Sequence, residues 1–200
     1  MRLIVGLGNP GIEYAWTPHN LGFLAIDRLA EMGGIRVDRP EAKSLIGRGE
    51  IAGEEVMLAK PQTMMNLSGY AVRELLERLE LTPAELIVLC DEVQLPWGMI
   101  RVNPEGSAGT HNGMKSVIAS IASTNFCRVR LGVGPDHPVG DLAGYVLRPM
   151  RKGDLESAAE MIDQAAEAVK MILTEGVDKA MTKFNRRNTP KNEEGETSSE

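Results

Sequence analysis

The chain opens with the pattern of a buried strand that stops at a glycine-rich loop. The apolar run Leu3–Gly6 leads into a Gly-Asn-Pro-Gly loop at residues 8–11, and His19 follows a further bend. In open α/β sheets, ligands bind in the crevice beyond the carboxyl ends of the strands. The opening therefore predicts an α/β protein with Asn9 and His19 near a ligand site.

Strand and helix patterns alternate along the rest of the chain. The most apolar run, residues 86–90, predicts a central strand covered on both faces that ends at Asp91-Glu92. A hairpin pattern at 44–59 interrupts the alternation, so a mixed sheet is expected. Periodicity predicts helices at 20–32, 68–80, 113–123, 154–174 and 177–185, and strands at 3–6, 44–51, 55–59, 86–90, 99–102 and 128–133. Residues 135–149 are predicted to form a connection rich in proline and glycine.

These segments predict one domain over residues 1–185, a twisted mixed β-sheet flanked by helices in three α/β/α layers. Residues 186–200 contain no apolar side chain, so this polar tail is predicted to be disordered. The two cysteines lack a CxxC spacing and no apolar stretch approaches about 18 residues. A cytoplasmic protein without a membrane partner is therefore expected.

Positive charge is concentrated in one part of an acidic chain. The net charge is −6, yet residues 101–152 carry seven basic and three acidic side chains. Any polyanionic partner is expected to use this segment.

The glycines at 6, 8 and 11 spell G-x-G-x-x-G, the dinucleotide-binding fingerprint, and Asp38 could supply the ribose-binding acid. That fingerprint requires a helix that starts at the glycines. Pro18 would interrupt such a helix, so the glycines favour a tight turn instead. No cofactor is predicted.

The remaining candidates for chemistry are histidines, carboxylates and asparagines. No histidine pair has zinc-helix spacing, no Gly-x-Ser-x-Gly occurs, and Cys90 lies inside a strand pattern, so neither a metal site nor a serine or cysteine nucleophile is favoured. His19 oriented by Asp91 could act as a general base. Asn9, Asn66 and Asn112 lie at junctions of loops with regular elements, where asparagine either donates amide hydrogens to a ligand or simply caps a turn.

Several motifs in a fixed order narrow these options. They are Gly6–Gly11 with Tyr14, Thr17–Gly22, Lys60–Gly69, Asp91-Glu92 with Leu95-Pro96, and Gly109–Ser116. With these motifs, residues 2–185 resemble the bacterial peptidyl-tRNA hydrolases.

The resemblance implies hydrolysis of the ester between a peptide and the 3′-terminal ribose of tRNA. His19 corresponds to the catalytic histidine and Asp91 to the acid that orients it. The implied partner is peptidyl-tRNA, bound through its CCA end and acceptor stem by a monomer. Residues that bind the substrate or line the site are then Asn9, Tyr14, Met65, Asn66, His111 and Asn112, with Lys115 and Arg130 as phosphate contacts.

The chain departs from the family pattern where tRNA affinity is concerned. Pro18 replaces an arginine, Thr110 replaces a glycine, and the segments 103–105 and 134–140 are less basic than expected. An RNA-binding module without catalysis is an alternative, since chloroplast group II intron splicing factors share the resemblance. A dinucleotide-dependent enzyme is a third possibility and rests on the glycines alone.

Overall fold

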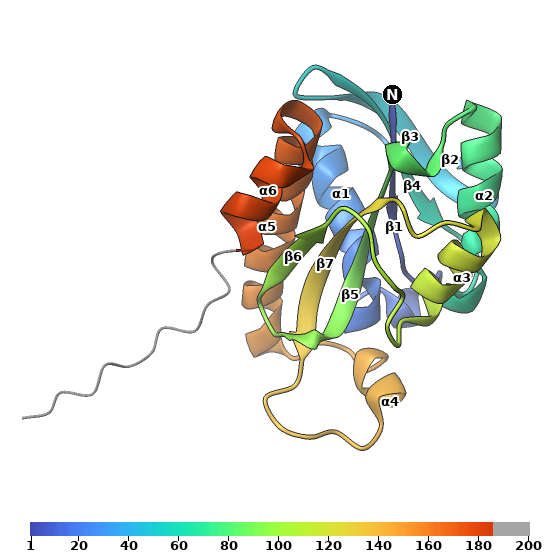
Figure 1. Cartoon of the computed structure of the whole chain (residues 1–200). Helices are drawn as coiled ribbons and strands as arrows, with labels where there is room; N and C mark the ends of the chain where they lie inside the picture. The colour runs from blue at the N-terminus through green and yellow to red at the C-terminus, as the bar shows by residue number, and fades with distance from the viewer. Residues whose placement is uncertain (186–200) are drawn as a thin grey trace, which may run out of the picture.

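The computed structural model describes residues 1–185, so the tail predicted at 186–200 lies outside the described residues. A seven-stranded sheet runs in the order β2-β3-β4-β1-β5-β7-β6 (Figure 1). Its strands are β1 Arg2–Gly6, β2 Arg39–Glu41, β3 Ser44–Ile51, β4 Glu54–Pro61, β5 Leu86–Pro96, β6 Ile100–Asn103 and β7 Cys127–Gly134. The central strands β4, β1, β5 and β7 are parallel, whereas β2, β3 and β6 pair antiparallel with their neighbours. The predicted mixed sheet is confirmed.

Helices cover both faces of this sheet (Figure 1). They are α1 Leu21–Gly33, α2 Ser68–Leu79, α3 Asn112–Ile121, α4 Leu142–Val146, α5 Lys152–Glu175 and α6 Val177–Phe184. Short 3-10 turns lie at η1 Ile12–Tyr14, η2 Pro18–Asn20, η3 Met65–Leu67 and η4 Pro83–Glu85. The fold is a single α/β domain in three layers, as predicted.

Two apolar cores explain why the interior of β1 and the first half of β5 are continuously apolar. In β1, Ile4 belongs to the core that also contains side chains of α1, α5 and α6, while Leu3 and Val5 belong to the core that contains side chains of α2 and α3. Successive side chains of a strand point to opposite faces, so a strand with both faces buried needs apolar residues at every position.

Three sequence predictions need correction. The central strand does not end at Asp91-Glu92: β5 continues to Pro96 beside β7. The 135–149 connection contains α4, whose start is capped by the Asp141 carboxylate accepting from the Gly144 N–H at 2.9 Å. The short edge strand β2 was not predicted.

The glycines near the N-terminus serve helix packing. A Cβ on Gly6 would lie 2.1 Å from the carbonyl oxygen of Gly22, and one on Gly8 would lie 2.6 Å from the Phe23 ring. Only the three-residue 3-10 turn η1 follows Gly11, and the first α-helix starts at Leu21, so the fingerprint glycines do not adjoin the N-terminus of an α-helix. Asp38 forms an ion pair with Arg36 at 2.6 Å. The turn interpretation therefore fits the structure and the dinucleotide interpretation does not.

Candidate active site

The site lies where β1 leaves the sheet and β5 continues. The Leu7 N–H donates to the Leu89 carbonyl at 3.0 Å, and the chain then turns away, whereas Asp91 stays paired with Leu131 of β7. A crevice opens beside a strand whose neighbour departs. Asp91 and the Asn9 loop therefore meet at one edge of the sheet, as the sequence predicted.

His19 and Asp91 form the pair that the sequence predicted. The His19 Nδ1 lies 3.0 Å and 2.9 Å from the two carboxylate oxygens of Asp91. Pro18 opens the turn η2 that carries His19, and its ring fixes φ for that first position. Because an ionised carboxylate only accepts, Nδ1 carries the proton and Nε2 is left as the basic nitrogen.

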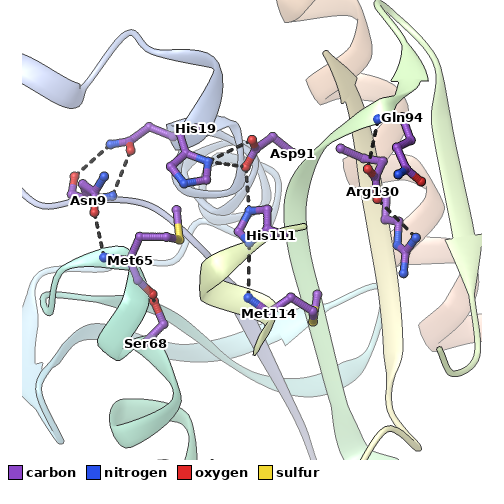
Figure 2. A network of polar contacts seen from close by, with 11 residues as sticks. Asn9, His19, Met65, Ser68, Asp91, Gln94, His111, Met114 and Arg130 are labelled. Carbon is purple, nitrogen blue, oxygen red and sulfur yellow. Dashed lines mark hydrogen bonds and ion pairs between the residues drawn. The ribbon is translucent and has the colours of Figure 1, made fainter. Parts of the chain in front are cut away.

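His111 is a second partner of the same carboxylate, which the sequence did not predict (Figure 2). Its Nε2 lies 2.8 Å from Asp91 Oδ1, while its Nδ1 accepts from the Met114 N–H at 3.2 Å at the start of α3. That acceptor role puts the ring proton on Nε2, which donates to Asp91. The His19 and His111 rings lie 4.9 Å apart at 44°. Asp91 thus bridges two imidazoles.

The two histidines keep Asp91 ionised although it is buried. Burial by itself would raise the pKa of the Asp91 carboxyl, but the electrostatic attraction and hydrogen bond of His111 and the hydrogen bond of His19 outweigh it and hold this pKa below its usual range. Asp91 is 2% exposed, against 13% for His19 and 9% for His111. The site therefore contains a fixed negative charge behind a partly accessible base.

This pKa shift predicts a difference in acid stability. A carboxyl with a depressed pKa in the folded state stabilises the fold above its unfolded pKa of about 3.9, and this contribution is lost as the pH falls below that value. Wild type should therefore lose unfolding free energy relative to Asp91→Asn below about pH 4. Urea unfolding of both proteins between pH 6 and pH 3 measures the difference. A difference that does not change with pH would contradict the depressed pKa.

Asn9 is held by a residue that the sequence did not single out. Asn20 accepts from the Asn9 N–H and donates to the Asn9 carbonyl, both at 2.9 Å. The Asn9 Oδ1 accepts from the Met65 N–H at 2.7 Å (Figure 2). Because this bond fixes the orientation of the amide, the Asn9 NH₂ remains available as a donor.

Met65 links this asparagine to the α3 side of the site. A Cβ on Gly113 would lie 2.4 Å from the Met65 Sδ and 3.1 Å from the His111 Cε1, so the thioether lies against the start of α3 next to His111. Met65 is 5% exposed. It is therefore a wall of the site rather than a free contact surface.

The other predicted residues lie around this centre with different exposure. Asn66 on η3 and Asn112 at the start of α3 are exposed, and Tyr14 on η1 is half-buried. Lys115 is exposed on the first turn of α3 and forms no ion pair within residues 1–185.

Arg130 is not a free cation. Its Nη1 donates to Glu92 at 3.2 Å and its Nη2 to the Ser107 carbonyl at 3.0 Å. Arg128, fully buried, donates to the Gly106 and Ser107 carbonyls. The two arginines of β7 thus anchor the loop that leads to His111.

A cavity of about 190 Å³ lies in front of the histidine pair. It is enclosed on one side by α4 through Leu142, Ala143, Val146 and Leu147. Its other lining residues are His19, Asp91, Glu92, Val93, Thr110, His111 and Asn112. A small reactant can therefore reach His19 without full exposure to solvent.

No histidine pair has the sequence spacing of a zinc-binding helix, but the fold does bring three potential metal ligands together. The ligand atoms of His19, Asp91 and His111 all lie within 4.8 Å of one another. The imidazole nitrogens that face Asp91 already donate hydrogen bonds to it, so a metal ion would have to displace both protons. The donor set fits a hydrogen-bonded triad better than a metal centre.

Neither cysteine is suited to nucleophilic chemistry. Both are buried, and burial raises the pKa of the Cys90 thiol far above its usual range and that of Cys127 to about 12. A thiol must ionise to act as a nucleophile.

Comparison with known proteins gives one consistent result. A family model described as peptidyl-tRNA hydrolase matches residues 3–193. The chain is 54% identical over 187 residues to the peptidyl-tRNA hydrolase of Solibacter usitatus, covering 94% of this chain and 95% of that protein. It is 51% identical over 197 residues to that of Koribacter versatilis, covering 98% of each.

A solved structure agrees with these sequence matches. The crystal structure of peptidyl-tRNA hydrolase from Acinetobacter baumannii matches with a TM-score of 0.87 and 35% identity, covering 92% of this chain and 94% of that one. Sequence and structure together show that the chain belongs to the peptidyl-tRNA hydrolase family.

Proposed function

We propose that this protein hydrolyses the ester that joins a peptide to tRNA in peptidyl-tRNA. The observation that carries the proposal is the Asp91–His19 pair, which leaves the His19 Nε2 unprotonated at the mouth of a small cavity. Family membership identifies the substrate class.

The chemistry requires one water molecule and no covalent intermediate. His19 Nε2 takes a proton from water, and the hydroxide attacks the ester carbonyl carbon. The bond from that carbon to the ribose oxygen then breaks, and the ribose oxygen takes the proton from the imidazolium. Asp91 stabilises the imidazolium while it exists. The products are a peptide carboxylic acid, which releases its proton to solvent, and a tRNA with a free hydroxyl.

Three asparagines would bind the reacting end of the substrate. The Asn9 amide, oriented through its bond to Met65, can donate to the ester carbonyl as negative charge develops there. Asn112 lines the cavity, Asn66 follows Met65 on η3, and both are exposed and would contact the peptide and the CCA end. Tyr14, Met65 and His111 would form the walls.

The acceptor stem would lie over the part of the basic segment that belongs to α3 and β7. Lys115 and Arg130 are the proposed phosphate contacts, and a chain of net charge −6 is expected to make about two to four such contacts. One chain supplies His19, Asp91 and His111, which supports action as a monomer. Within residues 1–185, the structure contains no helix capable of crossing a membrane. Translation takes place in the cytoplasm, where we propose that the protein acts.

The deciding experiment compares an N-blocked aminoacyl-tRNA with the free aminoacyl-tRNA. Release of tRNA from the blocked substrate alone would establish both reaction and substrate class. Binding of both without release would instead favour an RNA-binding module, and the intact Asp91–His19–His111 network argues against that alternative.

The phosphate contact of Arg130 can be tested through salt dependence. Arg130→Ala should raise KM by about tenfold and change kcat little, because a hydrogen bond to a charged group contributes about 1.5 kcal/mol to ground and transition states alike. The slope of log KM against log salt should fall by about one unit.

Two further variants separate a phosphate contact from loss of charge. Glu92→Gln removes the carboxylate that competes for Arg130 and should lower KM. Lys179→Ala removes one positive charge on α6, where Lys179 pairs with Glu175, and should change neither KM nor its slope. If the slope of log KM against log salt is the same in Arg130→Ala as in wild type, Arg130 contacts no phosphate and the tRNA must bind to another surface.

A further inference from the structure

A second and larger cavity adjoins the catalytic one. Its volume is about 930 Å³, against about 190 Å³ for the cavity at His19. It lies among the ends of β5 and β7, the segment 134–139, α4 and the start of α5. None of the residues implied by the family resemblance lines it.

The two cavities share a wall. Val93 lines both of them. Pro18 lines the larger cavity, and the next residue, His19, lines the smaller one. Likewise, on α4, Tyr145 lines the larger cavity and Val146 lines the smaller one. The larger cavity therefore begins one residue away from the catalytic base.

Their sizes imply different occupants. Small-molecule sites have volumes of about 300–1,000 Å³, so the catalytic cavity is too small to hold more than a fragment of a large substrate. A peptidyl ester with several amino-acid residues must continue outside it. The larger cavity falls within the range of ligand sites and lies on the other side of the shared wall.

Part of its lining is apolar and rich in proline. Five prolines, at positions 18, 96, 135, 138 and 149, contribute to it. The polar atoms of the two aromatic residues are already engaged, since Trp97 Nε1 donates to Ser157 Oγ and the Tyr145 hydroxyl to the Val133 carbonyl, both at 2.8 Å. The rings are therefore left as apolar surface for a ligand.

Two cationic side chains of the lining have no ion-pair partner. Arg148 and Arg151 line the cavity and form no ion pair within residues 1–185. The lining also carries two carboxylates: Asp136 bonds to His137 at 2.6 Å, and Asp154 accepts from the Arg151 backbone N–H at 3.2 Å and keeps its negative charge. An acidic side chain would find two unpaired guanidinium groups there.

We propose that the larger cavity binds the peptide part of the substrate, upstream of the esterified residue, and favours acidic side chains. This inference rests on the proposed function. The proposed tRNA contacts lie on α3 and β7, whereas the larger cavity lies between α4, the start of α5 and the ends of β5 and β7. In Figure 1, α4 extends beyond the ends of β5 and β7. Peptide and tRNA would therefore leave the reacting ester in different directions.

The test compares three substrates that carry the same tRNA. One is an N-acetyl-aminoacyl-tRNA, and the others are tetrapeptidyl-tRNAs with glutamate or glutamine at the two positions before the esterified residue. For wild type, KM for the glutamate peptide should be about fivefold lower than for the glutamine peptide, as expected for an ion pair of about 1 kcal/mol. The double variant Arg148→Ala/Arg151→Ala should abolish this difference and leave KM for the N-acetyl substrate unchanged.

A neighbouring lysine provides the matched control. Lys152 is exposed next to Arg151 and does not line the cavity, so Lys152→Ala should keep the preference for glutamate. Equal KM values for the two tetrapeptides in wild type would overturn the inference. So would an equal rise of KM for all three substrates in the double variant, because that result would indicate contact with tRNA. Failure of wild type to hydrolyse any of the three would instead refute the proposed function, and with it this inference.

Discussion

Replacing His19 by alanine is expected to lower kcat by about 10²- to 10⁴-fold while the protein still folds. The loss corresponds to the contribution of a positioned general base, and hydrogen-bond donors that bind the ester remain. KM should change little, because His19 acts on water rather than on the tRNA. Single-turnover hydrolysis of an N-blocked aminoacyl-tRNA measures the effect, and thermal unfolding checks the fold.

Chemical rescue would distinguish a base from a structural residue. The alanine variant enlarges a cavity of about 190 Å³ that is bordered by Asp91, so imidazole added to the buffer should restore part of the rate. Asp91→Asn should reduce activity less than His19→Ala, since water and the binding groups remain. Undiminished turnover in His19→Ala would refute the assignment of the base.

Gly22→Ala is expected to lower the free energy of unfolding by about 1–3 kcal/mol, the usual cost of overpacking. A Cβ at this position would lie 2.5 Å from the carbonyl oxygens of both Leu7 and Leu89. These are backbone atoms of β5 and of the residue that follows β1 and cannot rotate away, so α1 has to move. Because His19 lies three residues before Gly22, its contact with Asp91 should be disturbed and kcat should fall as well.

Gly153→Ala is the matched control for this substitution. Gly153 is the second residue of α5, as Gly22 is of α1, but a Cβ there would meet nothing within 4 Å. Alanine favours helix over glycine by about 1 kcal/mol, so Gly153→Ala should be neutral or stabilising. Chemical denaturation of both variants gives the comparison. Equal stability of the two would show that α1 is not held against the sheet by Gly22.

The sequence alone determined the strands and helices except β2 and α4, because these elements depend on short-range periodicity. Strands with both faces buried, such as β1 after Arg2 and the first half of β5, are apolar at every position, and the longer helices show an apolar stripe. The family motifs also placed His19 and Asp91 in one site. Each of these signals lies within a few consecutive residues or in a known order of motifs.

Other features depended on contacts between distant parts of the chain. From the sequence, the strand at residues 86–90 was expected to end at Asp91, because burying a carboxylate without hydrogen-bond partners is unfavourable. Its partners are His19 and His111, 72 and 20 positions away, and they let β5 continue. Neither separation leaves a local pattern.

The tertiary structure likewise decided how the basic segment is used. Composition indicated that residues 101–152 are basic, but only the fold shows that Arg130 is engaged by Glu92 and Ser107 while Arg148 and Arg151 line a cavity beside the catalytic base. A count of charges cannot distinguish these cases, because the electrostatic effect of a cation depends on its distance from a counter-charge. The sequence therefore determined which residues carry the chemistry, and the packing of β5, β7 and α4 decided what each of them can reach.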